Sequence, residues 1–526
     1  MEIVNNPGDK FKFIKPGEIR TRFAPSPTGF LHVGSARTAL FNYLFAKKYQ
    51  GIFVLRIEDT DRERSKPEFE ENIIEGLKWL GIEWDEGPYR QSERRNIYAK
   101  YLEKLLKEGK AYHCFCSAEE LEVQRQEQMS RGLPPRYNGK CAKLSPEEVE
   151  RNLSEGKKSV IKFKILAKKI VFEDIIRGRI EFDTGLMGDI SIAKNLKSPL
   201  YNFAVVVDDF EMKISHVIRG EDLLPNTPVQ ILLQETLSFP QPYYAHLPLI
   251  LGPDRSKLSK RHGAVSLREY KNEGYLPETL INFLSFLGWN PGTEREIFSL
   301  ASLIKEFSLP RVQKGGAIFN IKRLDFLNGF YIRQKSLERL TELCLPYLIE
   351  EGLIVPIWGQ KELILGVIKS PTEITGYQIV ETKEKISFEA LEKIISIYQE
   401  RLKKLSEITE LTDFFFKDKL KYEKKLLQWK DITDDEIAAS LDKLLEILSK
   451  IEELEWKKEN LENILLLQAE KFMVSLPNQI GDRGRLLWPL RVALSAKEAS
   501  AGPFEIAGIL GKEKTLKRIK EARELF

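Results

Sequence analysis

The sequence has few cysteines, almost no net charge and no long apolar run. Only 4 of its 526 residues are cysteine, which argues against a disulfide scaffold. The 82 basic and 78 acidic residues leave a formal net charge of +4. This excludes a strongly basic nucleic-acid coat but allows local basic patches. No apolar stretch approaches the ~20 residues of a membrane span, and the N-terminal MEIVNNPGDKFKF lacks the apolar core of a secretory signal. We therefore expect a cytoplasmic protein with no membrane contact.

The chain is too long for one compact domain, because a single core stops growing near ~250–300 residues. With 42% hydrophobic and 30% charged residues, it can bury sizeable cores and remain soluble. We expect roughly three to five modules.

The N-terminal part alternates between strand and helix patterns. We predict a strand over 19–24, a helix over 35–48, a strand over 52–57 and a further helix over 72–80. Two strands joined by a helix indicate a right-handed βαβ unit in a parallel sheet. The predicted fold class is α/β, with a Rossmann-like nucleotide-binding sheet.

Residues 107–199 have a different pattern. They contain a cysteine pair, a charged helix over 118–131 and an alternation over 159–165 that favours a strand. The α/β pattern resumes with the apolar run 203–207. We therefore predict an α+β domain inserted between two halves of one sheet.

The second half of the sheet is predicted from three elements. A strand over 214–218 precedes a helix that starts with Thr227 as N-cap and Pro228 in the first helical position. A strand over 246–251 follows, and then the charged loop GPDRSKLSKRHG.

Beyond about residue 340, apolar residues recur at three- to four-residue spacing, with lysine and glutamate between them. This spacing is typical of amphipathic helices, and no alternating strand series is visible, so we predict a helical region. The spacing is clearest at Leu444, Ile447, Ile451, Leu454, Leu461 and Ile464.

Two segments have the residues that phosphate chemistry needs. In TRFAPSPTGFLHVG, Gly29 and Gly34 let the backbone approach a ligand, and His32 precedes a helix whose free N–H groups favour an anion. In Lys257–Arg261, KLSKR, three cations in one loop suit a polyphosphate. Taken singly, the histidine would more often be a helix cap and the loop a solvated basic loop.

Together the two segments resemble signature motifs of class I aminoacyl-tRNA synthetases. FLHVG is similar to their His-x-Gly-type nucleotide motif, and KLSKR to their mobile lysine-serine-lysine loop. RFAPSPTGFLHVGSARTALFNYLFA and the later RIEDTD resemble glutamyl- and glutaminyl-tRNA synthetases in particular. Residues 485–495 and AGPFEIAGILGKE, near the C-terminus, resemble the bacterial glutamyl enzymes, so the resemblance covers most of the chain.

The resemblance implies that ATP drives the attachment of L-glutamate to tRNA(Glu) in two steps, through glutamyl-adenylate. Negative charge builds on phosphate oxygens in the first step, so fixed donors and cations are needed, together with Mg²⁺. The implied catalytic residues are His32, Gly34, Lys257, Ser259 and Lys260. The implied ATP-binding residues are Pro25, Thr28, Gly29, His32, Gly34 and Lys260.

The resemblance also implies a glutamate pocket. Its residues are Arg22, Ala24, Ser26, Glu58, Tyr201 and Arg219. Glu58 is expected to meet the ammonium group, and Arg219, in HVIRGED, to face the side-chain carboxylate, because a guanidinium fork matches a carboxylate. Where relatives can place asparagine, this chain has Val205, so that contact is not expected here.

Three cysteines, Cys114, Cys116 and Cys141, lie close together in the sequence. In a reducing compartment this pattern suggests zinc more than a disulfide. Related enzymes complete such a site with histidine two residues after the last cysteine, where this chain has Lys143. By resemblance to short tRNA-modifying relatives, the fourth ligand is expected to be Tyr137. The alternative is a degenerate site whose thiols only pack.

The predicted domains are five segments: a first catalytic half in 1–106, an inserted acceptor-stem-binding domain in 107–199, a second catalytic half in 200–262, a stem-contact domain in 263–339 and a helical anticodon-binding region in 340–526. We expect two subdomains in the last segment, and a monomer.

Other functions remain open on the sequence. A glutaminyl enzyme should end in β-barrels, and the short relative that modifies a tRNA base lacks an anticodon domain. A non-catalytic tRNA-binding paralogue need not keep His32, Gly34, Lys257 and Lys260. An enzyme that also charges tRNA(Gln) with glutamate is a further alternative.

Overall fold

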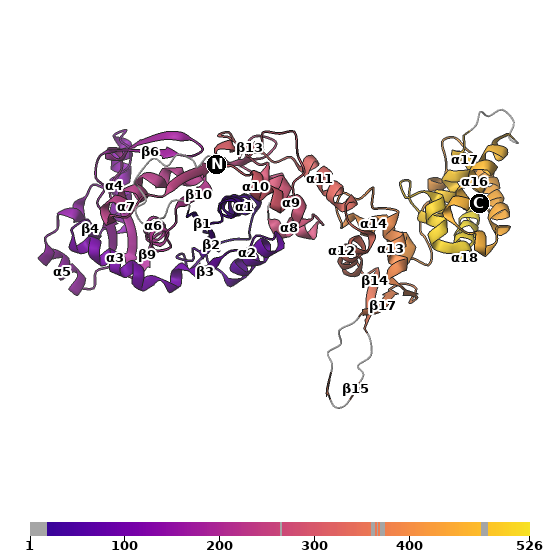
Figure 1. Cartoon of the computed structure of the whole chain (residues 1–526), viewed down its shortest axis with the longest axis horizontal. Coiled ribbons are helices and arrows are strands. Elements are labelled where there is room, and N and C mark those ends of the chain that lie inside the picture. The colour runs from indigo at the N-terminus through magenta and orange to yellow at the C-terminus, as the bar shows by residue number, and fades with distance from the viewer. Residues whose placement is uncertain (1–17, 264–265, 359–362, 365–366, 369–373, 475–481) are drawn as a thin grey trace. The chain divides into compact units, whose positions relative to one another are not determined.

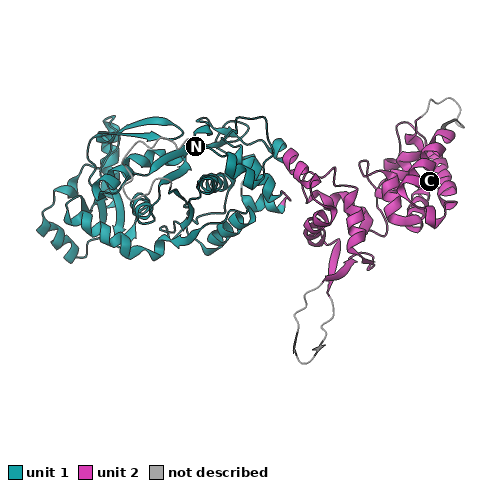
Figure 2. Cartoon of the chain, in the orientation of Figure 1, with its two compact units in different colours: residues 1–272, 276–324 teal, residues 273–275, 325–526 magenta. Residues whose placement is uncertain are grey.

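The computed structural model describes residues 18–526 except 264–265, 359–362, 365–366, 369–373 and 475–481. The chain forms two compact units (Figure 2). Unit 1 contains residues 1–272 and 276–324, and unit 2 contains residues 273–275 and 325–526. Within the described residues, no helix has the length and apolar character needed to cross a membrane.

A parallel sheet forms the centre of unit 1. Strand β1 (Arg20–Phe23) pairs in parallel with β2 (Ile52–Ile57), and β2 pairs in parallel with β3 (Glu86–Arg90). Helix α1 (Val33–Lys48) connects β1 to β2, so the predicted βαβ unit is confirmed. The buried face of α1 is almost entirely apolar, because the helix is enclosed by the rest of the unit.

The second half of the sheet continues from β1. The Ser215 N–H donates to the Arg20 carbonyl oxygen at 3.0 Å, which places β10 (His216–Gly220) beside β1 (Figure 1). Strand β10 pairs in parallel with β11 (Tyr243–Leu247). The chain therefore reverses its direction of strand addition between β1 and β10, and ligands of such sheets bind beyond the carboxyl ends of the strands at that point.

The segment between the two halves forms its own antiparallel sheet. Strand β4 (Ala111–Cys114) pairs with β5 (Val160–Phe163), β5 with β8 (Ile190–Asn195), and β8 with β9 (Ser198–Pro199). The charged helix α4 (Ala118–Ser130) agrees with the prediction for 118–131. A short helix α5 (Pro146–Ser154) follows it.

One hairpin of this segment reaches the parallel sheet, which the sequence did not predict. Strand β6 (Lys169–Asp174) pairs with β7 (Gly178–Asp183) in antiparallel fashion, and Asp174 of β6 also pairs with Tyr244 of β11. The inserted segment thus contributes the last residue of β6 to the side of β11 away from β10.

Helices pack on this framework, and some bounds differ from the prediction. Helix α2 (Pro67–Trp79) begins earlier than expected, at a proline that is favoured in the first turn. Helix α3 (Arg95–Lys107) leads into the inserted segment. The apolar run 203–207 lies in helix α6 (Tyr201–Glu211), where all five residues are buried.

Thr227 is not an N-cap, so that prediction is wrong. A 3₁₀ turn over Glu221–Asn226 runs directly into α7 (Thr227–Leu237), and Thr227 has helical dihedrals. The side chain of Thr227 instead accepts a hydrogen bond from Arg219. The predicted strand over 246–251 is divided into β11 and the short β12 (Ile250–Leu251).

The remainder of unit 1 is mainly helical. It contains α8 (Leu267–Asn272), α9 (Pro277–Ser285) and α10 (Leu300–Glu306). Strand β13 (Ala317–Ile318) pairs with β12, and α11 (Ile321–Arg333) follows, with its residues from Asp325 onward in unit 2.

Unit 2 is mostly helical, as predicted. Its helices are α12 (Leu337–Glu350), α13 (Phe388–Ser396), α14 (Glu407–Thr412), α15 (Asp434–Ser449), α16 (Lys458–Val474), α17 (Gly484–Ser495) and α18 (Pro503–Arg523). The prediction that no strands follow residue 340 is nevertheless wrong. Strands β14 (Ile354–Trp358), β17 (Ile374–Ile379) and β18 (Lys385–Ile386) form an antiparallel sheet, and β15 (Leu363–Ile364) pairs with β16 (Val367–Ile368). The burial of β14 does not alternate, and that of β17 alternates only over its last four residues, so a period-two pattern is short.

Candidate active site

His32 caps the helix that begins the first motif. It is the N-cap of α1, with an extended backbone, and its ring accepts the Ser35 N–H at 3.3 Å. A Cβ on Gly34 would lie 3.1 Å from the His32 ring, so glycine leaves room for this ring position. His32 therefore caps the helix, which was the alternative to a functional role on the sequence alone. The residue is also exposed, at the end of α1 where the free N–H groups lie.

The chain that follows the second motif lies beside the first motif. The Leu267 N–H donates to the Leu31 carbonyl at 2.8 Å, and Ser266 forms a bridge with His32. Desolvation by the surrounding protein, and then the positive charge of Lys257, lower the pKa of His32, while Asp222 opposes them. The structure thus brings together two segments that are more than 200 residues apart in the sequence.

Within this loop, Lys257 Nζ lies 3.8 Å from Asp222 Oδ2 and is exposed. The Ser259 N–H donates to His262 Nδ1 at 3.1 Å. The backbone of Lys260 is in a short 3₁₀ turn, but its side chain lies outside the described part of the chain. The loop therefore presents Lys257 near His32, and the role of Lys260 stays a prediction.

The loop after β1 carries the other expected ATP contacts. Thr28 N–H donates to Ser26 O at 2.9 Å, and Glu58 N–H donates to Pro25 O at 2.9 Å. The second bond ties the loop to the end of β2. Ala24, Ser26, Thr28 and Gly29 consequently lie beyond the carboxyl ends of the central strands, where the sheet topology places a ligand.

A buried ionic network lies behind this loop. Arg22 Nε donates to Asp209 Oδ1 at 3.1 Å, and Arg56 donates to the same oxygen at 2.8 Å and to Glu58 at 3.0 Å. All of these side chains are buried. Burial raises the pKa of Glu58, although Arg56 and Arg22 act in the opposite direction. Arg22 and Glu58 were expected in the pocket, whereas Arg56 and Asp209 were missed.

Both missed residues had a signal in the sequence. Arg56 interrupts the apolar strand IFVLRI, and Asp209 ends the apolar run FAVVVDD. A charge inside an apolar run is buried only when it is paired. An ion pair between Arg56 and Asp209 could therefore have been predicted.

Arg219 is a buried cation held by neutral acceptors. It is 4% exposed, and donates to His246 Nε2 at 3.1 Å, Gln230 Oε1 at 2.8 Å and Thr227 Oγ1 at 2.9 Å. Across the described ranges, no carboxylate oxygen lies within 4.0 Å of it. A guanidinium carries more N–H donors than these acceptors take, so the site has capacity for an added anion.

Tyr201 belongs to the same neighbourhood. Burial raises the pKa of its hydroxyl, and the charges of Arg219, Glu58 and Arg22 all act on it. These predicted pocket residues are therefore brought together from β1, from the residue that follows β2, from α6 and from β10. Val205 is buried in the apolar core. Its side chain has no polar atom, so it makes no hydrogen bond to a ligand.

The three cysteines of the inserted segment converge. Their sulfurs lie within 4.8 Å of one another, with Cys116 Sγ and Cys141 Sγ 3.6 Å apart. Tyr137 Oη is 3.5 Å from the sulfurs of both Cys114 and Cys116. Ligands at ~2.3 Å from a tetrahedral zinc ion are about 3.8 Å apart, so these distances suit such an ion.

Neighbouring groups shift the pKa values of these thiols in opposite directions. The Phe115 N–H donates to Cys141 Sγ. This bond and the hydroxyl of Tyr137 outweigh burial and lower the pKa of the Cys141 thiol. Burial raises the pKa of Cys116 to about 11. His113 is not among the ligand atoms that converge within the described residues, and its Nδ1 lies 3.1 Å from Ser159 Oγ.

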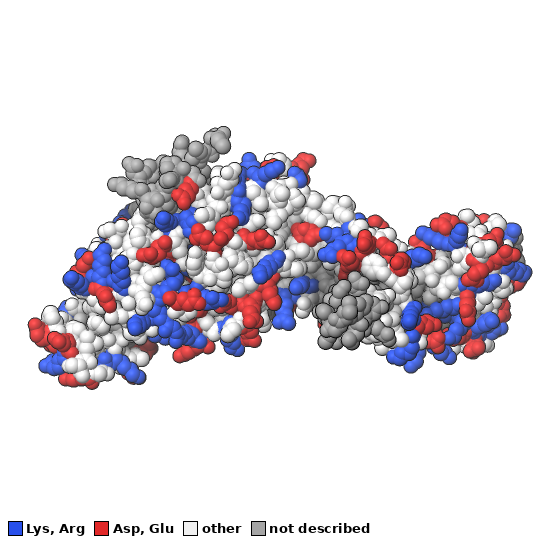
Figure 3. All heavy atoms as spheres, turned by 60° about the horizontal axis from the view of Figure 1, so that its bottom comes forward, with Lys and Arg blue, Asp and Glu red and all other residues white. Residues whose placement is uncertain are grey.

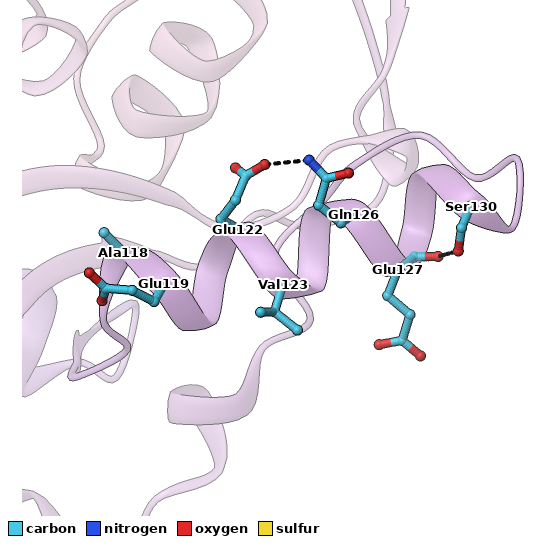
Figure 4. Close-up of a pocket in the computed structure, with 7 residues that line it drawn as sticks. All are labelled: Ala118, Glu119, Glu122, Val123, Gln126, Glu127 and Ser130. Atoms are coloured by element: carbon cyan, nitrogen blue, oxygen red, sulfur yellow. Dashed lines mark hydrogen bonds between the residues drawn. The ribbon is translucent and has the colours of Figure 1, made fainter.

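A shallow pocket elsewhere lacks suitable chemistry. It follows the exposed side of α4, where Glu119, Glu122 and Glu127 line it together with Val123 and Gln126 (Figure 4). Acidic side chains repel phosphates and carboxylates. The candidate active site is therefore the region of His32, Lys257 and Arg219 at the carboxyl ends of the sheet.

The chain is similar to known proteins along nearly its whole length. The description "tRNA synthetases class I (E and Q), catalytic domain" matches residues 18–326, and "Anticodon binding domain" matches residues 339–523. A glutamate–tRNA ligase of Carboxydothermus hydrogenoformans is 44% identical and aligns over 95% of this chain and 99% of its own length. Glutamate–tRNA ligase 1 of Caldicellulosiruptor saccharolyticus is 46% identical, over 96% and 98% of the two chains.

A solved structure is also similar. The glutamate–tRNA ligase of Elizabethkingia meningosepticum superimposes with a TM-score of 0.79 at 35% identity, and the match covers 96% of this chain and 99% of that chain. The likeness therefore extends through both units.

Proposed function

This chain belongs to the class I tRNA synthetases for glutamate and glutamine, and from that premise we propose how its residues attach glutamate to tRNA. It is an ATP-dependent glutamate–tRNA ligase, as are its relatives along nearly the whole chain. These relatives do not favour a non-catalytic paralogue or a glutaminyl enzyme.

The observation that carries the proposal is the buried, uncompensated charge of Arg219. Three neutral acceptors fix its guanidinium, and an isolated buried charge is costly without a partner. The side-chain carboxylate of glutamate supplies that partner. Glutamine is disfavoured because its amide N–H groups would face the N–H donors of Arg219.

The remaining pocket residues divide the other charges of glutamate. Glu58 meets the ammonium group with the oxygen that Arg56 does not occupy, and Tyr201 closes the side of the pocket. Arg22, held by Asp209, faces the amino-acid pocket with Ala24 and Ser26. The α-carboxylate is then free to attack the α-phosphorus of ATP.

In the first step a bond forms between the α-carboxylate oxygen and the α-phosphorus, and the bond to pyrophosphate breaks. His32, Gly34 and the N-terminal N–H groups of α1 stabilise the phosphate oxygens, and Pro25, Thr28 and Gly29 line the nucleotide. Lys257 and Lys260, supported by Ser259, neutralise the leaving pyrophosphate. Mg²⁺ enters with the ATP phosphates.

In the second step a hydroxyl of the terminal ribose of tRNA(Glu) attacks the glutamyl carbonyl, and AMP leaves. The inserted segment meets the acceptor end, and the region matched as an anticodon-binding domain meets the anticodon. On the face shown in Figure 3, basic and acidic side chains are interspersed. Together with the formal net charge of +4, this supports tRNA binding through local basic patches rather than through a uniform positive surface.

A zinc ion held by Cys114, Cys116, Cys141 and Tyr137 has a structural role in this proposal. When bound, it ties the loop after β4 to the turn at Cys141. It takes no part in glutamate activation.

The test is Arg219→Leu in aminoacylation. Each charge-assisted bond to the carboxylate is worth roughly 1.5–3 kcal/mol, so kcat/KM for glutamate should fall steeply and the preference over glutamine should weaken. His216→Asn, which alters a buried residue of the same strand away from the pocket, is the control. Unchanged glutamate kinetics in Arg219→Leu would place the carboxylate elsewhere.

A further inference from the structure

Arg219 is held in place by a chain of two buried side chains. Its Nε donates to His246 Nε2 at 3.1 Å, and His246 Nδ1 lies 2.6 Å from Asp174 Oδ2. The side chains of His246 and Asp174 have no solvent exposure. Asp174 is the last residue of β6, so the inserted segment reaches the glutamate pocket through this contact.

Donors surround the carboxylate of Asp174. Oδ1 accepts the N–H groups of Ile176 and Arg177, both at 2.9 Å. Oδ2 accepts the backbone N–H of His246 at 3.1 Å in addition to the ring. These bonds and the histidine outweigh burial and lower the pKa of Asp174. The carboxylate is ionised and accepts, so the ring proton is on Nδ1.

The other ring nitrogen is consequently an acceptor. Burial and then the charge of Arg219 lower the pKa of His246, although Asp174 opposes them, so the ring is neutral. Nε2 then accepts the Arg219 Nε–H, and Thr227 Oγ1 lies 3.2 Å from it. Each hydrogen bond from Asp174 through His246 to Arg219 therefore joins one donor to one acceptor.

The opposite side of the guanidinium is fixed in the same way. Gln230 Nε2 donates to Asn202 Oδ1 at 3.0 Å, which leaves Gln230 Oε1 to accept from Arg219. Asn226 also donates to Asn202 Oδ1, at 3.1 Å. The amide of Gln230 therefore cannot rotate without losing both contacts.

We propose that Asp174 and His246 are positioning residues for amino-acid selection. Asp174 fixes the His246 tautomer, and His246 fixes the plane of the Arg219 guanidinium, so that its remaining N–H donors face the side-chain carboxylate of glutamate. This inference rests on the proposed function of Arg219.

The arrangement has a physical rationale. A carboxylate in direct contact with Arg219 would hold it equally well but would cancel much of its charge. A neutral imidazole provides the same geometric constraint without that cancellation. The anion that orients the imidazole is one residue further away, so the substrate meets a fixed and largely uncompensated cation.

Two substitutions at one position separate the contacts. In His246→Gln the amide oxygen reaches the position of Nε2 and can still accept from Arg219. In His246→Asn the shorter amide reaches only the position of Nδ1, so it can bond Asp174 but not Arg219. We expect His246→Asn to raise the KM for glutamate about tenfold to hundredfold, with little change in kcat, because the bond is made in ground and transition states alike. His246→Gln should recover most of this loss.

The matched control is His216→Asn. His216 is also a buried histidine of the parallel sheet, bonded to Ser215 and packed between Phe45 and Tyr243. The His216→Asn substitution should lower the melting temperature without a selective rise in the KM for glutamate. A KM in His246→Asn no higher than in this control would overturn the proposal, as would equal losses in His246→Asn and His246→Gln.

Asp174→Asn tests the tautomer. Two N–H groups, of Ile176 and Arg177, face the Oδ1 position, and one backbone N–H, of His246, faces the Oδ2 position. We therefore expect the amide oxygen at Oδ1 and the amide NH₂ facing Nδ1, which shifts the ring proton to Nε2, as in other histidine–aspartate pairs. Two donors, Nε2–H and Arg219 Nε–H, would then oppose each other, and the KM for glutamate should rise at least as much as in His246→Asn.

Nitrogen NMR of the wild-type protein reads the tautomer without altering the proposed contacts. The chain has 5 histidines, so the resonances of His246 can be assigned by exclusion, with the other four histidines substituted one at a time. A proton on Nδ1 is expected, and a proton on Nε2 would overturn the proposal. If Arg219→Leu impairs glutamate use while Asp174→Asn and His246→Asn do not, the positioning inference fails and the proposed function stands. If Arg219→Leu has no effect, the proposed function itself fails.

Discussion

At the scale of single residues, the site separates charges that are paired from charges that are not. Arg22 and Arg56 share Asp209 in the buried network, so they serve as fixed framework. Among the described residues Arg219 has neutral partners only, whereas Lys257 is exposed and only loosely paired with Asp222. Arg219 is therefore the buried cation available to the glutamate side chain, and Lys257 an exposed cation available to phosphate.

The first prediction concerns Lys260. If it neutralises charge that develops on the phosphates, Lys260→Ala should slow adenylate formation by about 10²–10³, measured by pyrophosphate exchange with tRNA present. Binding of tRNA should hardly change. Arg255→Gln, which removes another cation of the same loop, is the control and should leave the rate unchanged. Equal losses of adenylate formation and tRNA binding would contradict the role of Lys260.

The sequence predicted part of this residue arrangement. The resemblance named Arg22, Glu58, Tyr201 and Arg219, and the structure brings them together. It did not reveal His246 or Asp174, because their function depends on the pairing of β6 with β11, between residues that are 72 positions apart. A single sequence has no local pattern for such a contact.

At the scale of elements, the predictions were best where a local pattern decides the structure. The βαβ unit and α4 are close to their predicted bounds. The hairpin β6–β7 and the sheet β14–β17–β18 were missed. Burial alternates along β6, but Val171 lies on its exposed side and Asp174 on its buried side, so the apolar residues do not follow that alternation. Thr227 was misassigned because the preceding turn removes the need for a cap.

The second prediction concerns the loop of the cysteine cluster. Three thiolates and a phenol should bind zinc, less tightly than four cysteines do, and with a pH dependence as the ligands protonate. We expect up to about one zinc per chain in protein purified without chelator. Elemental analysis of metal-replete protein measures the zinc content. The absence of zinc would show that the thiols only pack.

The third prediction separates a structural from a catalytic metal. Replacing Cys114 and Cys116 with serine should remove zinc and destabilise the inserted segment, with adenylate formation largely retained. Cys344→Ser, which changes a buried cysteine of α12 outside the cluster, should leave the zinc content unchanged. A collapse of adenylate formation while the inserted segment remains folded would point to a metal that acts in catalysis.

At the scale of the whole molecule, the two units suggest a division of labour. Unit 1 contains the sheet and all the proposed groups for chemistry, and it has its own core. Most of unit 2 lies in the region that matches an anticodon-binding domain. The finer domain boundaries predicted from the sequence, after residues 106, 199, 262 and 339, stay predictions.

The fourth prediction tests this division. A chain that ends after Lys335, between α11 and α12, should fold, because unit 1 has a separate core. It should still form glutamyl-adenylate but lose selective charging, since recognition of unstacked anticodon bases would be lost. Normal discrimination between tRNAs by the truncated chain would show that specificity lies in unit 1.

The most direct test of the central claim is aminoacylation by the purified full-length chain, with tRNA(Glu) and tRNA(Gln) each offered glutamate and glutamine. The account predicts that glutamate is joined to tRNA(Glu) in an ATP-dependent reaction and that glutamine is not used, because Arg219 selects a carboxylate. Attachment of glutamine, or no attachment of glutamate to tRNA(Glu), would contradict it.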